Sequence, residues 1–213
     1  MTRRRRVLAA ICAIIAVALA AAWLLWSNPE PSRSQAWPLV TLPTIAGPTA
    51  KPNVCEQEPS SEPFTPTRID IDHIQARIPV IALGRDGNNV PSVPPISNVG
   101  KAEFAWDKPP GLMPGSPKGN VLLNAHTWPD GSALGNRLLA KLKVNDKIAV
   151  RGDSTHLCYR VTEKIEVVAS NGFPAYYERE GDPQLAIIVC SGTRLGPGHW
   201  TKRTIWFAAP ITA

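Results

Sequence analysis

The chain has 213 residues, a length that suits one domain of ordinary size with appendages. Its apolar share of 44% is enough for a hydrophobic core, and its 22 prolines disfavour an all-helical bundle. The formal net charge is +6, but residues 3–6 are four consecutive arginines. The remaining 19 positive and 17 negative charges nearly balance, which argues against a nucleic-acid-binding domain with a basic face.

The N-terminus predicts a membrane anchor. Residues 7–26 carry no charge, and a helix of this length spans about 30 Å, the thickness of the hydrocarbon core of a bilayer. The basic tail 1–6 would stay cytoplasmic under the positive-inside rule. A cleaved signal peptide is the alternative, but its apolar core is usually shorter, about 7–15 residues, and no small-residue cleavage site follows Trp26. We therefore expect a single-pass protein of the cell membrane with its remaining domain outside.

A proline-rich segment separates this anchor from the rest of the chain. Residues 27–66 contain nine prolines together with Ser, Thr and Glu, and they show no sustained periodicity. Such segments form extended, semi-rigid spacers. We therefore expect an extracellular linker over 27–66 and a folded domain over 67–213.

The folded domain is expected to be mainly β. Short alternating or apolar runs predict strands at 68–72, 78–83, 121–125, 147–151, 157–169, 185–189 and 204–208. Leucines at 134, 138 and 142 behind Ser132 predict one short helix. Residues 91–117 hold seven prolines and are expected to form a long ordered loop. One helix among seven or eight strands suggests a closed or nearly closed barrel.

Three residues at the ends of predicted strands are candidates for chemistry. Cys190 closes one apolar strand and His126 follows another, while Arg203 opens the last strand. Each alone is typical of a structural residue: a buried thiol, a satisfied histidine and a solvated strand end. Together they suggest a nucleophile, because a thiol needs a nearby base or cation to react and an arginine can stabilise an oxyanion.

At these residues the sequence resembles the sortases. The resemblance rests on His126 in LLNAHTW, Cys190 in LAIIVC and Arg203 in HWTKRTIWFA, in that order along the chain. The Pro- and Gly-rich stretch 114–119 before the histidine strand is most like class F and class E enzymes of actinobacteria. The chain departs from the family in having Ala125 before the histidine, where glycine is frequent, and Val189 before the cysteine, where threonine is frequent.

The resemblance implies a closed eight-stranded sortase barrel with one or two short helices. It also implies a cysteine transpeptidase that cleaves an LPXTG or LAXTG sorting signal between Thr and Gly. Cys190 would form the thioacyl-enzyme, His126 would act as acid and base, and Arg203 would hold the oxyanion or the substrate backbone. The expected partners are secreted proteins that carry the signal and an amine of the cell wall.

The resemblance also bears on the substrate groove and on cofactors. Ile188 is a candidate groove wall, with a plain core position as the alternative. Residues 170–183 and 191–202 are expected to form loops that flank the cysteine strand and line the groove. No acidic cluster supports the calcium site of some relatives, so we expect no metal and no cofactor.

Two further cysteines are candidates for a disulfide. Cys55 lies in the linker and Cys158 in a predicted strand, and an oxidising extracellular setting favours a bond between such a pair. A zinc site built from His156, Cys158 and His199 is the alternative, but no Cys-x-x-Cys pair or other ligand spacing supports it.

Other functional classes fit the sequence less well. Papain-like peptidases place their cysteine before their histidine, the reverse of the order in this chain, and the Ser-His-Gly-Cys signature of L,D-transpeptidases is absent. A membrane-tethered, non-catalytic β-module that binds cell-wall polymer or protein would share the anchor, linker and barrel. Only the reactivity of Cys190 separates that module from an enzyme.

Overall fold

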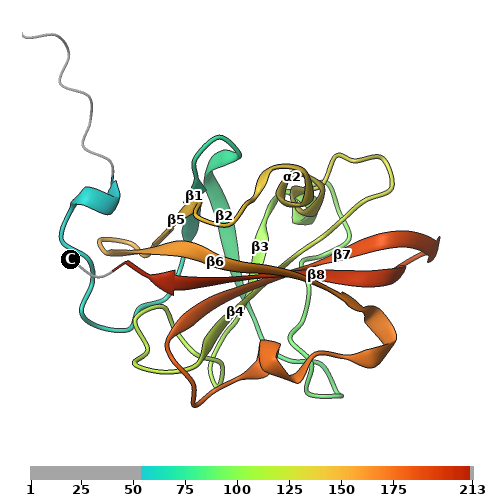
Figure 1. Cartoon of the computed structure of the whole chain (residues 1–213). Coiled ribbons are helices and arrows are strands. Elements are labelled where there is room, and N and C mark those ends of the chain that lie inside the picture. The colour runs from blue at the N-terminus through green and yellow to red at the C-terminus, as the bar shows by residue number, and fades with distance from the viewer. Residues whose placement is uncertain (1–53, 212–213) are drawn as a thin grey trace, which may run out of the picture. The chain divides into compact units, whose positions relative to one another are not determined.

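The structure, a computed structural model, describes residues 54–211 (Figure 1). Eight strands in this part of the chain close into a barrel in the order β1-β2-β3-β4-β7-β8-β6-β5. The strands are β1 (Arg68–Ile71), β2 (Gln75–Leu83), β3 (Phe104–Asp107), β4 (Asn120–Ala125), β5 (Lys147–Arg151), β6 (His156–Val168), β7 (Gln184–Gly196) and β8 (His199–Pro210). The α-helix α2 (Leu134–Lys141) connects β4 to β5, and four short 3-10 helices lie at Val54–Glu56, Gly100–Ala102, Ala169–Asn171 and Pro174–Tyr177. The mainly-β closed barrel predicted from the sequence is confirmed.

Three neighbouring strands matter most for function. β4 and β7 are parallel, although 58 residues separate the end of one from the start of the other, and β7 and β8 form an antiparallel pair. The end of β4, the middle of β7 and the start of β8 therefore lie side by side on the barrel.

Successive side chains of these strands point alternately into the barrel and toward its outer face. Leu123 and Ala125 of β4, like Ile187 and Val189 of β7, belong to the main core inside the barrel. Successive residues of a strand point to opposite faces. The residues between and after them, such as Ile188, are therefore turned outward.

A second, smaller core covers part of this outer face. Leu122, Ala186, Ile205 and Phe207 pack there against Tyr176 of the 3-10 helix Pro174–Tyr177. The Tyr176 hydroxyl donates a hydrogen bond to the Leu123 carbonyl at 3.1 Å. Burial raises the pKa of Tyr176 well above its ordinary value, so this phenol stays neutral. The cover extends over one end of β4, β7 and β8 and leaves the other end for the groove described below.

Two segments expected to be loops contain regular structure. Residues 91–117 hold β3, whose Phe104 and Trp106 are buried in the main core. The sequence pattern missed this strand because all four of its residues are buried, so they do not alternate between apolar and polar. Residues 191–202 were expected to form a loop, but β7 continues to Gly196 and β8 begins at His199, which makes this segment a hairpin. Its side chains are mostly exposed, so it lacks the apolar alternation that predicts a strand.

The proline-rich linker was expected to reach residue 66, but the structure places the segment 54–66 against the barrel. Phe64 belongs to the main core, and its amide donates to the Pro114 carbonyl at 3.0 Å. One aromatic residue among prolines gave no periodic signal. The expected anchor at 7–26 and the first part of the linker lie outside the described residues. Within residues 54–211, no helix combines the length and hydropathy needed to cross a bilayer.

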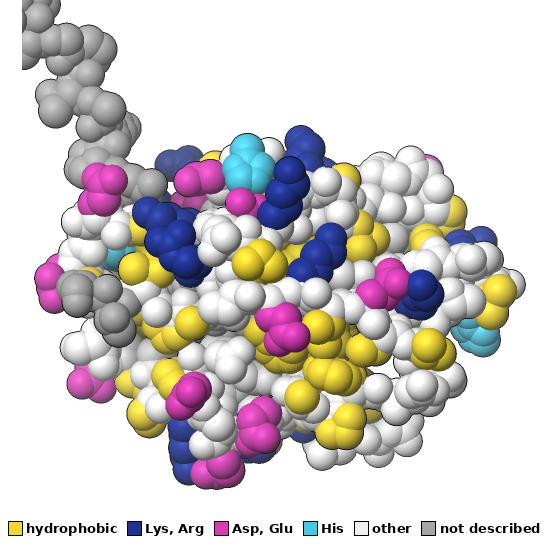
Figure 2. All heavy atoms as spheres, in the orientation of Figure 1, with side chains coloured by type: hydrophobic (Ala, Val, Ile, Leu, Met, Phe, Trp, Pro, Cys, Tyr) yellow, Lys and Arg dark blue, Asp and Glu magenta, His cyan; other side chains and the backbone are white. Residues whose placement is uncertain are grey.

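Charges of both signs are mixed on the surface. Figure 2 shows Lys and Arg side chains next to Asp and Glu on the face turned to the viewer. The surface carries ion pairs, such as that of Lys202 with Glu166 at 2.6 Å, and exposed pairs of this kind stabilise a fold by only about 0–1 kcal/mol. This face offers no basic patch of the kind that binds nucleic acid.

The structure joins Cys55 and Cys158, the pair expected from the sequence, in a disulfide with a Cα–Cα distance of 5.6 Å. The bond ties the segment before the barrel to the buried start of β6. Its two cysteines are 103 residues apart, so the bond closes a long loop and strongly restricts the unfolded chain.

We predict that reduction of the denatured protein exposes two additional thiols per chain, measured with a chromogenic thiol reagent. Replacing both Cys55 and Cys158 with Ser should lower the free energy of unfolding by about 2–4 kcal/mol, because the unfolded chain regains its freedom. An unchanged thiol count on reduction would contradict the bond.

Candidate active site

The pairing of three strands brings together the three residues expected to react. Cys190 in β7 lies directly opposite Arg203 in β8. Ala125, the last residue of β4, pairs with Val189 in β7, so the residues that follow them, His126 and Cys190, are neighbours. Neighbouring strands lie about 4.8 Å apart. The histidine, cysteine and arginine therefore form one row across the outer face of the barrel.

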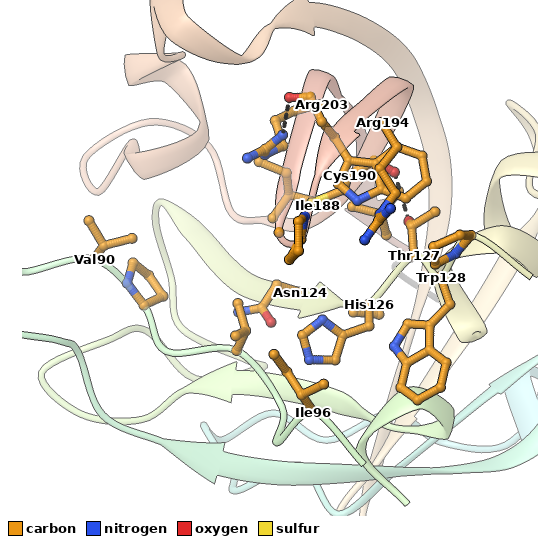
Figure 3. Close-up of a pocket in the computed structure, with 18 of the residues that line it drawn as sticks. Val90, Ile96, Asn124, His126, Thr127, Trp128, Ile188, Cys190, Arg194 and Arg203 are labelled. Atoms are coloured by element: carbon orange, nitrogen blue, oxygen red, sulfur yellow. Dashed lines mark hydrogen bonds between the residues drawn. The ribbon is translucent and has the colours of Figure 1, made fainter. Parts of the chain in front are cut away.

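This row lies in an apolar groove of about 610 Å³ (Figure 3). The volume is typical of a site that holds a small ligand or a short peptide segment. Besides the three residues of the row, the groove is lined by Ile188 and Val189 and by residues of four other regions: Val90, Pro91, Val93 and Ile96; Asn124, Ala125, Thr127, Trp128 and Pro129; Tyr176 and Tyr177; and Arg194, Pro197, Gly198 and Trp200.

Cys190 has the free thiol among the described cysteines, and it is half-buried. Burial raises the pKa of this thiol above its ordinary value, while the positive charge of Arg203 partly opposes that rise. The resting residue is therefore mainly the neutral thiol at physiological pH. Because the thiolate is the nucleophile, the site needs a base next to Cys190.

His126 can supply that base, and one of its nitrogens is held by the main chain. Its Nε2 lies 2.6 Å from the carbonyl oxygen of Pro94. A carbonyl only accepts hydrogen bonds, so Nε2 must carry a hydrogen. In the neutral ring the other nitrogen, Nδ1, then bears the lone pair and is free to take up a proton. Figure 3 shows the ring between the chain that carries Ile96 and the strand that carries Cys190.

The turn after His126 is held by hydrogen bonds to β7 and to α2. The Thr127 hydroxyl donates to the Cys190 carbonyl at 2.7 Å, which links the end of β4 to β7. The amide of Gly135, in the first turn of α2, donates to the His126 carbonyl at 2.8 Å. A Cβ at position 135 would lie 2.5 Å from that oxygen, so only glycine allows this approach.

Asn136, the next residue of α2, completes the support of the turn. Its side-chain oxygen accepts from the Trp128 amide at 2.9 Å, and its side-chain nitrogen donates to the Trp128 carbonyl at 3.0 Å. The two bonds hold the main chain of Trp128 from both sides. The direction of the chain after His126 is therefore set by α2.

Arg203 is oriented by the hairpin that carries it. Its Nη1 donates to the carbonyls of Trp200 at 3.2 Å and Lys202 at 2.9 Å. These bonds use one nitrogen of the guanidinium, and neither Nε nor Nη2 has an acceptor among residues 54–211. A planar guanidinium held in this way can present its remaining donors to an oxygen that becomes negative next to Cys190.

The structure brings together all the sequence-predicted site residues of the groove. Ile188, two residues before Cys190 on the same face of β7, lines the groove and also packs against the smaller core, so both sequence interpretations apply to it. Both segments expected to line it contribute, 170–183 through Tyr176 and Tyr177 and 191–202 through the hairpin.

Sequence reasoning missed the wall formed by residues 90–96, between β2 and β3. The sequence does contain a hint of this wall, because apolar residues stand among the prolines of the segment. In the structure Ile96 is 85% exposed. An exposed apolar run in an irregular segment indicates a binding surface.

Metal ligands do not cluster in the described part of the chain. Residues 54–211 contain no group of three or more His, Cys, Asp or Glu side chains placed to hold an ion. Of the three zinc-ligand candidates, Cys158 is in the disulfide.

A family model described as "Sortase domain" matches residues 69–211, which is more than half of the chain. The chain belongs to the sortase family. No curated protein matches it.

Solved structures share the sortase fold at low identity. The pilus-related sortase C of Group B Streptococcus is 18% identical, with 73% of this chain and 70% of that one covered and a TM-score of 0.51. Sortase C1 from Streptococcus suis is 17% identical, with coverages of 72% and 75% and a TM-score of 0.50. Sortase A of Listeria monocytogenes is 21% identical, with coverages of 68% and 85% and a TM-score of 0.49.

The environment of the thiol in this sortase leads to a prediction. Alkylation of Cys190 by iodoacetamide should have its midpoint at a higher pH than alkylation of a cysteine in a short unstructured peptide, because burial disfavours the thiolate. Arg203→Ala should move the midpoint higher still, because the positive charge favours the thiolate, and Arg203→Lys should move it less. Site-specific mass spectrometry over a pH series measures both midpoints, and a Cys190 midpoint below that of the unstructured peptide would contradict the burial effect.

Proposed function

We propose that this sortase is a membrane-anchored cysteine transpeptidase that acts on sorting signals of the LPXTG or LAXTG type. It cleaves the bond between Thr and Gly and joins the new carboxyl end to an amine of the cell wall. The observation that carries the proposal is the row of His126, Cys190 and Arg203 in a single apolar groove.

The first half-reaction forms a thioacyl-enzyme. His126 accepts the thiol proton through Nδ1 as the sulfur of Cys190 attacks the Thr carbonyl carbon. The carbonyl oxygen becomes negative and is stabilised by the free donors of Arg203. When the tetrahedral intermediate collapses, the C–N bond breaks and His126 returns its proton to the departing Gly nitrogen. The signal is then held as a thioester on Cys190.

The second half-reaction reverses these roles. An amine attacks the thioester carbon while His126 removes one of its protons, and Arg203 again stabilises the oxyanion. The C–S bond then breaks, an amide forms, and His126 returns the proton to the sulfur. Two acyl transfers of moderate difficulty replace one difficult amide exchange.

The groove suits a peptide in both steps. A peptide bound between its apolar walls would displace water from the row, which strengthens the charge interactions there. A dry site also favours the amine over water as the second nucleophile. The binding-module alternative leaves such an arrangement of acid, base and thiol unexplained.

The cellular setting belongs to the same proposal. The apolar run 7–26 anchors the protein in the cell membrane, the basic tail stays inside, and the catalytic domain works outside. Its partners are then secreted proteins with a C-terminal sorting signal and a cell-wall precursor amine. The Pro- and Gly-rich stretch before the histidine strand supports a place among class F or class E enzymes.

The proposal predicts transfer of the peptides Leu-Pro-Ala-Thr-Gly or Leu-Ala-Ala-Thr-Gly to hydroxylamine. Cys190→Ala should abolish hydroxamate formation. His126→Ala should lower kcat/KM by about 10²–10⁴-fold, and Arg203→Ala by about 10²–10³-fold, with Arg203→Lys less affected. Chromatography with mass detection quantifies the products.

His199→Ala is the matched control, because this exposed histidine does not line the groove, and it should react like the wild type. Product formation by Cys190→Ala would overturn the mechanism. A reduced Cys190 that resists every alkylating reagent would favour the non-catalytic module.

A further inference from the structure

The ion pair of Arg85 and Asp107 is the most buried one among residues 54–211, and the proposed mechanism does not use it. The side chain of Asp107 has no exposed area and that of Arg85 is 18% exposed. The guanidinium meets the carboxylate in a two-pronged arrangement, with Nη2 2.6 Å from Oδ2 and Nε 3.2 Å from Oδ1. Burial of two charges costs so much hydration that such a pair adds little net stability. The geometry that the pair imposes is a better reason for keeping it.

Arg85 belongs to a hairpin-shaped turn, residues 84–92, that leaves β2 and leads to the wall of the groove. Its main chain pairs with that of Pro91 across the turn. The Ser92 amide also donates to the Gly84 carbonyl at 3.0 Å, which closes the turn on itself. The ion pair ties this closed turn to the last residue of β3.

The turn passes directly into the main chain that contacts the histidine. The carbonyl of its last residue, Ser92, accepts from Asn124 Nδ2 at 2.9 Å. Two residues later the carbonyl of Pro94 lies 2.6 Å from His126 Nε2. Three of the five residues 91–95 are prolines, whose rings restrict φ, so this piece of chain has few ways to bend. A displacement of the turn would therefore carry the Pro94 carbonyl with it.

We infer that the Arg85–Asp107 pair positions His126 through this turn. The pair holds the Pro94 carbonyl at the ring, where it keeps the hydrogen on Nε2 and leaves Nδ1 for the thiol proton of Cys190. Neither charged residue lines the groove, so neither touches a peptide bound there. The effect on the reaction rests on the proposed transpeptidase function, whereas the state of the histidine ring does not depend on it.

The hydrogen on Nε2 gives a direct test. Long-range ¹H–¹⁵N spectra of the full-length chain in detergent micelles, with ¹⁵N-labelled histidine, show which ring nitrogen carries the hydrogen. We expect a His126 Nε2–H signal that exchanges slowly with water, because the Pro94 carbonyl accepts this hydrogen. Its loss in His126→Gln assigns it.

Asp107→Asn should broaden or remove this signal through faster exchange. Asparagine keeps the shape of the side chain, but its NH₂ group faces the donors of Arg85 and cannot pair with them. The turn then loses its two-pronged contact with β3, and the Pro94 carbonyl is no longer held at the ring. An unchanged Nε2–H signal in a folded Asp107→Asn protein would overturn the inference.

The rate of transfer gives a second readout. Asp107→Asn should lower kcat for transfer of Leu-Ala-Ala-Thr-Gly to hydroxylamine by about tenfold, while KM for the peptide changes by less than about twofold. Arg85→Lys keeps the charge but not the two-pronged contact, so it should lie between Asp107→Asn and the wild type. This milder variant decides the question if Asp107→Asn does not fold. A rise in KM at constant kcat would mean that the pair only shapes the groove wall, and the inference would be wrong.

Arg151→Gln is the matched control. It breaks the partly buried ion pair of Arg151 with Asp70, which joins β5 to β1 and does not involve the turn. It should leave the Nε2–H signal and kcat as in the wild type. If Asp107→Asn and Arg85→Lys lower the melting temperature but match Arg151→Gln in both readouts, the pair is only structural and the inference is wrong.

The outcomes distinguish this inference from the function on which it rests. Transfer by the wild type together with an unchanged signal in Asp107→Asn would overturn the role of the pair and leave the transpeptidase intact. No transfer by a folded wild type whose Cys190 alkylates readily would overturn the transpeptidase, and the Nε2–H signal would still decide the role of the pair.

Discussion

The main-chain register of β4, β7 and β8 is the constraint on which the site depends. It aligns Ala125 with Val189 and Cys190 with Arg203, so three residues from distant parts of the chain share one row. Because side chains alternate between faces, a slip of one residue in β7 would turn Cys190 into the barrel and Val189 into the groove. The apolar interior, with Ile187 and Val189 on its side of β7, strongly opposes such a slip. The packing that stabilises the barrel thus also positions the nucleophile.

The segment between β2 and β3 adds a second level of control over the same row. Two of its carbonyls, those of Ser92 and Pro94, accept from Asn124 and His126. The spacing of two residues on the segment matches the spacing of two residues on one face of β4. One contact sets which nitrogen of His126 exchanges protons, and the other directs Oδ1 of Asn124 away from the loop. A proline-rich, irregular segment can hold this geometry because its main chain has little freedom of its own.

Apolar and alternating runs in the sequence predict most strands of the barrel. β4, β5 and the first half of β7 each contain several buried apolar residues in a row, which makes them recognisable. The sequence pattern misses β3, whose four residues are all buried, and the hairpin ends of β7 and β8, whose side chains are mostly exposed; neither segment alternates between apolar and polar residues. His126, Cys190 and Arg203 were found because they are reactive residue types at the ends of the predicted strands and match the sortase pattern there. Pro94 and Thr127 were not, because they act through a carbonyl and a main-chain contact that depend on tertiary structure. No sequence pattern records which carbonyl will meet a histidine 32 residues away.

The central claim is that Cys190 carries the acyl group between the two half-reactions. Acid quenching during turnover of the Leu-Ala-Ala-Thr-Gly peptide, followed by proteolysis and tandem mass spectrometry, tests it directly. We predict a Leu-Ala-Ala-Thr acyl group on Cys190, which disappears when hydroxylamine is added before the quench. Turnover without an adduct on Cys190, or an adduct on a different residue, would contradict the account.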